Sequence, residues 1–184
     1  ILASNRKRDK HKTSAKDPSL LSGKIVTNAG VTLTPTHAQT HGRRYRYYVE
    51  RRQKERVANG LRPIRLPAAE IEVSVCRELA TYLEDPIKLM DDLELSSAAQ
   101  VTQKSIRKKA KGIANRLKVE TIHRDDSNLV MGLVKTIKLL PKAKGYIMVV
   151  SLGDLASHLK LPNQSTSSEI AISVDLKLKV CNNG

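Results

Sequence analysis

The most constraining feature of the sequence is a strict two-residue alternation near its end. Apolar side chains occupy every second position from 170 to 180, and polar or small residues lie between them. Successive residues of a strand point to opposite faces, so this pattern predicts a strand with one buried face. Two earlier segments repeat their apolar residues at helical spacing instead. Helix and strand in separate stretches indicate an α+β fold.

The first predicted helix covers residues 67–84. Apolar residues recur at helical spacing from Ile71 to Leu83, and Pro67 suits the first turn, where its missing N–H costs nothing. We interpret the Asp-Pro pair at 85–86 as the end of this helix.

The second predicted helix covers residues 97–118, with Ser96 or Ser97 as its N-cap. Its apolar residues gather on one side at 100° per residue, and its cations lie on the opposite side. Lys104, Lys108 and Lys111 form a candidate anion-binding patch there. Together with the following turn, the two helices make a helical region at 67–124.

The first third of the chain contains a basic linker at 1–18 and a small β module at 19–66. The linker has no apolar periodicity, and its Arg6, Lys7 and Arg8 either follow phosphates or belong to a solvated tether. Strand-like alternation in the module is interrupted at 34–37, which predicts a break there. Residues 50–66 are expected to form a loop.

A strand at 43–49 interleaves arginine with tyrosine. Arg44, Arg46 and Tyr48 share one face of that strand, and Tyr45 and Tyr47 share the other. The arginine face suits phosphate contacts with Tyr48 packing against base or sugar, whereas we favour Tyr45 and Tyr47 as core residues.

The last predicted region, 125–184, is a small mixed α/β segment. It contains a turn at 141–145, a strand at 146–150, a short helix near 152–159, a polar loop at 162–168 and the alternating strand.

Charge is distributed very unevenly along the chain. The sequence has 184 residues, with 33 Lys+Arg against 18 Asp+Glu and a net charge of +15. Residues 1–66 carry +12, residues 67–95 carry −6 and residues 96–124 carry +7. Two basic blocks separated by an acidic one point to a polyanion that is contacted by particular elements.

Several kinds of site are not supported by the sequence. It contains no Gly-rich phosphate loop, nucleophile elbow or His-Glu-x-x-His pair. His37 and His41 are four residues apart but are better explained as turn histidines, and the carboxylates between 84 and 94 as a solvated acidic face. Two cysteines cannot make a disulfide framework and fit a reducing cytosol. We therefore expect no catalytic residue, metal, cofactor or membrane span.

Four ordered motifs carry a family resemblance: PSLLSGKI (18–25), LTPTHA (33–38), GRRYRYYV (42–49) and RLPAAEIE (65–72). The set resembles the region downstream of the catalytic domain in bacterial serine site-specific recombinases of the resolvase/invertase superfamily. Residues 1–6, 133–137 and the terminal strand are similar by pattern. The first residue, Ile1, is not Met, which suggests a truncated or processed piece.

The resemblance implies a zinc-ribbon-like DNA-binding module followed by helices that contribute to synapsis. No cysteine pairs are present in the module, so it would fold without zinc. The family's Tyr-x-Arg-x-Ser signature belongs to a catalytic domain and is absent, so this chain would bind DNA in the bacterial cytoplasm, at the nucleoid, without cutting it. The candidate DNA-binding residues are Arg6, Lys7, Arg8, Arg43, Arg44, Arg46, Tyr48, Arg51, Arg52, Lys104, Lys108 and Lys111.

Two alternatives use the same sequence differently. The helices at 67–84 and 97–118 could serve self-association of the recombinase, with DNA contact incidental. A small basic RNA-binding protein would explain the charge but not the ordered motifs.

Overall fold

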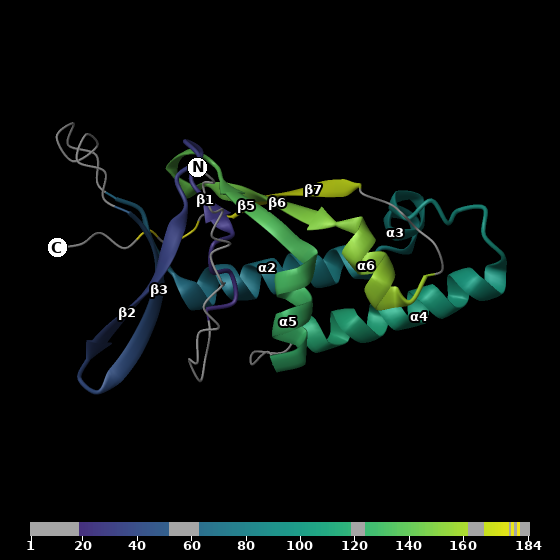
Figure 1. Cartoon of the computed structure of the whole chain (residues 1–184), viewed down its shortest axis with the longest axis horizontal. Coiled ribbons are helices and arrows are strands. Elements are labelled where there is room, and N and C mark those ends of the chain that lie inside the picture. Colours follow the sequence, from purple (N-terminus) through teal and green to yellow (C-terminus); the bar gives the residue numbers. More distant parts are fainter. Residues whose placement is uncertain are drawn as a thin grey trace, which may run out of the picture.

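A computed structural model describes residues 19–51, 63–118, 124–161, 168–176, 178 and 180. The described chain has an α+β fold in which five α-helices accompany two sheets (Figure 1). The larger sheet has the order β1-β5-β6-β7, with β1 parallel to β5 and the other pairs antiparallel. Its strands are β1 (Ile25–Val26), β5 (Val134–Leu139), β6 (Gly145–Ser151) and β7 (Glu169–Asp175).

The smaller sheet is antiparallel, in the order β2-β3-β4. It consists of β2 (Leu33–Thr40), β3 (Arg43–Glu50) and β4 (Arg65–Pro67). The predicted break at 34–37 is wrong, because β2 runs through Pro35 without interruption. Within the described chain β2 pairs only with β3, and an edge strand tolerates a residue that cannot donate a backbone hydrogen bond.

Helix α2 (Ala68–Glu84) confirms the first predicted helix to within one residue. Its apolar face is buried from Ala68 to Leu83. The Ser74 hydroxyl on α2 lies 2.8 Å from the Tyr146 hydroxyl on β6, which joins the helix to the larger sheet. Figure 1 shows α2 between that sheet and α4 (Gln100–Leu117).

Asp85 ends α2, as the sequence predicted, and it also has a second role. The Asp85 side chain accepts hydrogen bonds from the backbone N–H groups of Ile87 and Lys88 at 3.1 and 3.0 Å. It therefore caps a short helix that the sequence analysis missed, α3 (Pro86–Asp92), with Pro86 at the first position, where proline is favoured.

The second predicted helix is also confirmed, but its predicted cap is wrong. Helix α4 begins after Ala99 with no side-chain cap, and the Ser96 hydroxyl bonds to Asp91 instead. The Gln103 side chain donates to carbonyls in the preceding loop, including those of Leu95 and Ala98, and so closes that loop against the first turn.

The C-terminal third contains α5 (Arg124–Leu133), the 3₁₀ turn η1 (Pro141–Ala143) and α6 (Leu152–Leu159). The predicted turn, strand and short helix are confirmed. The alternating segment forms β7, with Ile170, Ile172 and Val174 toward the core, but the strand ends at Asp175. A Cβ at Gly145 would overlap the Val174 carbonyl, so this strand pair requires glycine.

Candidate nucleic-acid interface

The β2–β3 hairpin extends away from the helices as a two-stranded ribbon (Figure 1). Strand β4 pairs only with residues 47–49 of β3. The part of the hairpin between Tyr47 and the turn therefore has two strands. Thr40 is opposite Arg43, which leaves His41 and Gly42 as the loop. Both have positive φ, 49° and 74°, as a type I′ turn requires, and this turn matches the natural twist of the ribbon.

The end of this ribbon carries two arginines on opposite faces. Arg43 and Arg44 are exposed, and neither pairs with a carboxylate in the described part of the chain. Because neighbouring strand residues point to opposite sides, the two guanidinium groups face in opposite directions. Both residues are therefore accessible to a ligand, and their contact with DNA stays a prediction. Arg51, at the other end of β3, is exposed as well.

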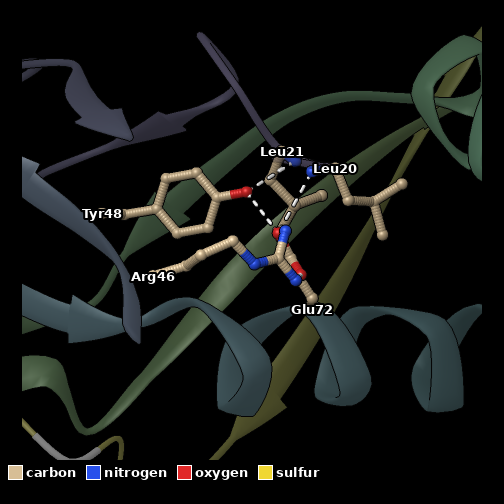
Figure 2. A network of polar contacts seen from close by, with 5 residues as sticks. All are labelled: Leu20, Leu21, Arg46, Tyr48 and Glu72. Atoms are coloured by element: carbon tan, nitrogen blue, oxygen red, sulfur yellow. Dashed lines mark hydrogen bonds and ion pairs between the residues drawn. The ribbon is translucent and has the colours of Figure 1, made fainter. Parts of the chain in front are cut away.

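The base of the ribbon is held by a buried polar network around Glu72 (Figure 2). The Tyr48 hydroxyl donates to Glu72 Oε1 at 2.6 Å and accepts from the Leu21 N–H at 2.8 Å. The Leu20 N–H donates to the same Oε1 at 3.1 Å. Arg46 donates to Glu72 Oε2 at 3.0 Å. The network joins β3 to α2 and to the chain segment before β1.

The prediction that Tyr48 contacts nucleic acid is wrong. Its side chain is fully buried, and burial, then the charge of Glu72 and the hydrogen bond to it, raises the pKa of its hydroxyl far above the ordinary value. Arg46 is also a poor phosphate ligand, since its side chain is only 24% exposed and is paired with Glu72. The face shared by Arg44, Arg46 and Tyr48 thus passes from solvent to core along the strand.

The expected core positions on the other face are also wrong. Tyr45 is 43% exposed, and Tyr47 is half-buried with the Arg65 guanidinium carbon 3.9 Å from its ring centroid. Alternation shows which residues share a face but not which face is buried, and the buried partner Glu72 comes from a distant segment.

Strand β2 adds two exposed polar side chains that were not among the candidate DNA-binding residues. His37 lies opposite Arg46 and Gln39 lies opposite Arg44, so they share the face of those arginines. Both are exposed. An uninterrupted strand through Pro35 would have predicted this placement from the alternation alone.

The second predicted patch lies on the outer face of α4. Lys104, Lys108 and Lys111 are all exposed, as their helical spacing predicts. The opposite side of the helix is buried from Ile106 to Leu117. The patch belongs to a different element from the hairpin. The remaining candidates, Arg6, Lys7, Arg8 and Arg52, fall outside the described residues.

Metal and thiol chemistry find little support in the described ranges. They contain no group of three or more His, Cys, Asp or Glu residues that could hold a metal ion. His37 lies in β2 and His41 in the hairpin turn. Burial, followed by the charges of Glu72 and Asp126, raises the pKa of the Cys76 thiol to about 12, so this thiol stays protonated and unreactive.

No helix in the described part of the chain is both long and apolar enough to cross a membrane. Comparison with known proteins finds no matching family model, no matching curated protein and no matching solved structure.

Proposed function

We propose that the chain is the DNA-binding C-terminal part of a bacterial serine site-specific recombinase, in which the β2–β3 hairpin enters the major groove of duplex DNA. The observation that carries this proposal is the ribbon with exposed Arg43 and Arg44 on its two faces. A major groove is about 12 Å wide and admits a two-stranded ribbon. An arginine on each face can then reach either wall of the groove, or the edge of a guanine.

The buried network at the base of the hairpin supports this role. Arg46, Tyr48 and Glu72 fix the ribbon to α2, so its end is presented in one orientation without a ligand-induced rearrangement. In this proposal the β2-β3-β4 sheet takes the place of a zinc-ribbon-like module, and the polar network substitutes for the metal. The exposed lysines of α4 would add phosphate contacts, and strand cleavage would belong to a separate catalytic domain.

Salt dependence of binding to a generic DNA duplex tests the proposal. Six to ten phosphate contacts predict an affinity that falls by roughly 10³–10⁵ between 50 and 200 mM salt. The double variant Arg43→Ala/Arg44→Ala is expected to reduce the slope of log affinity against log salt by about 2. The control is Lys138→Ala/Lys144→Ala, which removes two exposed charges from the region of the larger sheet. A wild-type affinity that is insensitive to salt contradicts DNA binding by this surface.

The two alternative hypotheses have separate tests. Helices α2 and α4 bury their apolar faces within the chain, and their exposed large apolar residues in the described ranges are Val73 and Val101. A concentration-dependent dimer in analytical ultracentrifugation without DNA would favour self-association. Competition between equal lengths of duplex RNA and duplex DNA separates the RNA hypothesis, since the A-form major groove is too narrow for a ribbon.

A further inference from the structure

Helices α4, α5 and α6 line a groove of about 490 Å³ on one side of the molecule. That volume lies in the range of small-molecule sites. Among the described residues, none that lines the groove is acidic. Five of the lining residues carry or can acquire a positive charge: Lys108, Lys109, Arg116, His158 and Lys160.

Two of these cations are held in place by the fold. The Lys109 ammonium donates to the Leu159 carbonyl at 2.8 Å, which ties α4 to the end of α6. Arg116 Nε donates to the buried Asp126 carboxylate at 2.8 Å, and the Arg116 side chain remains 55% exposed. A guanidinium has five N–H donors, so Arg116 keeps donors for a second acceptor.

The other three groups form no ion pair within the described chain, although His158 interacts electrostatically with the Asp154 carboxylate on the same helix. Lys108, His158 and Lys160 are exposed, and none of them pairs with a described carboxylate. His158 approaches α5 closely, since its Nε2 would lie 3.9 Å from a Cβ on Gly132. Cations from two helices therefore converge on one space.

A glycine in α4 leaves part of this groove unfilled. Gly112 lies in the middle of α4 and lines the groove, and a Cβ added there would meet no atom within 4 Å. Packing does not require this glycine, although glycine costs a helix interior about 1 kcal/mol relative to alanine. A larger residue at this position would fill the groove without altering any charge.

Lys160 occupies a position where glycine is normally favoured. It ends α6 in the left-handed conformation, with φ 57° and ψ 49°, and the following Leu161 N–H bonds to the Ala156 carbonyl at 3.0 Å. This is a Schellman ending, in which a side chain at that position is strained. The strained residue is also the cation at the rim of the groove.

From this convergence we infer that the α4–α5–α6 groove is a phosphate-binding site, distinct from the hairpin. Ammonium groups and a guanidinium fixed by Asp126 supply charge-assisted hydrogen bonds to phosphate oxygens, while Ile113 and Leu129 give the groove an apolar floor. The phosphate can belong to a nucleic acid backbone or to a small phosphorylated ligand. The site would bind it whether or not the hairpin binds DNA.

The test is isothermal titration calorimetry of the full chain with inorganic pyrophosphate at low salt. Lys160→Gly removes a cation and relieves strain, so pyrophosphate binding is expected to weaken about fivefold or more without a loss of thermal stability. Gly112→Met fills the groove and is expected to abolish binding while charge is unchanged. Lys138→Ala/Lys144→Ala, remote from the groove, is the control and should leave binding within twofold of wild type.

A parallel titration with a DNA duplex identifies the source of the phosphate. Weaker duplex binding by both groove variants supports a contact with the nucleic acid backbone. Unchanged duplex binding with weaker pyrophosphate binding supports a small phosphorylated ligand. If neither groove variant changes the binding of either probe, the inference is overturned. Lys160→Gly keeps the test decisive should Gly112→Met fail to fold.

Discussion

The hairpin and helix α4 present the same chemistry on different supports. Arg43 and Arg44 lie at the end of a two-stranded ribbon, whereas Lys104 and Lys111 lie on a helix whose opposite side is core. Alternation along β3 sends Arg46 of the same run toward α2, where it pairs with Glu72. Along a strand, part of a basic run is thus exposed and part is paired inside the fold, while the helical period keeps the lysines of α4 on the solvent side.

The largest expected effect on stability comes from the anchor of the hairpin, the buried polar network around Glu72. Glu72→Ala removes the acceptor for the Tyr48 hydroxyl, the Leu20 N–H and the Arg46 guanidinium. Loss of a buried charged acceptor of this kind is expected to lower the free energy of unfolding by about 3 kcal/mol. Urea denaturation followed by circular dichroism measures the change.

Glu169→Ala is the matched control for that variant, because Glu169 is an exposed carboxylate on β7. It should shift the free energy of unfolding by no more than about 0.5 kcal/mol. Glu72→Gln, which retains one acceptor oxygen, should fall between the two. Equal stability of Glu72→Ala and Glu169→Ala would show that the network does not anchor the ribbon.

Alkaline pH gives a second test of the anchor. Burial also raises the pKa values of Cys76, Tyr82 and Tyr146, so the contribution of Tyr48 must be isolated by comparing wild type with Tyr48→Phe. Burial holds the folded-state pKa of Tyr48 well above its ordinary value of 10.0. Its contribution to stability is complete below that value, and above it only the unfolded chain loses the proton. Stability contributed by Tyr48 should then fall by about 1.4 kcal/mol per pH unit.

Urea titrations between pH 9 and 11 test this dependence. The stability gap between wild type and Tyr48→Phe should be constant up to about pH 10 and shrink above it. Tyr45→Phe is the control, because Tyr45 is 43% exposed at the outer part of the hairpin. A gap that stays constant across the whole range would rule out a buried neutral Tyr48.

The smallest expected effect is on α4. Lys104→Ala/Lys111→Ala removes two exposed cations, both of them like-charge neighbours of Lys108 on the helix. The free energy of unfolding should therefore change by no more than about 0.5 kcal/mol. A straight helix follows a curved duplex backbone over a short distance. We therefore expect the salt slope for duplex binding to fall by about 1, against about 2 for Arg43→Ala/Arg44→Ala. A larger fall for the α4 pair would make α4 the main contact.

Local periodicity predicted the elements that have one continuous apolar face. Helices α2 and α4 and strand β7 follow from the spacing of their apolar residues. Helix α3 was not predicted, because Asp85 both ends α2 and caps α3. The predicted break at Pro35 was wrong because proline breaks an inner strand but not an edge strand such as β2.

Long-range partners account for most of what the sequence could not predict. Strand β1 pairs with β5, more than a hundred residues away, so the segment from residue 19 does not form one closed module. The buried face of β3 depends on Glu72, and the α4–α5–α6 groove depends on three helices meeting. The two arginines of the hairpin end were predictable because their exposure needs no distant partner.

Backbone amide chemical shifts of the ¹⁵N-labelled chain, titrated with duplex DNA, would show directly which residues contact the nucleic acid. We expect the largest shifts on the amides from Thr40 to Tyr45, with smaller shifts along the outer face of α4. Shifts confined to α4, or none at the hairpin end at saturating duplex, would contradict this expectation.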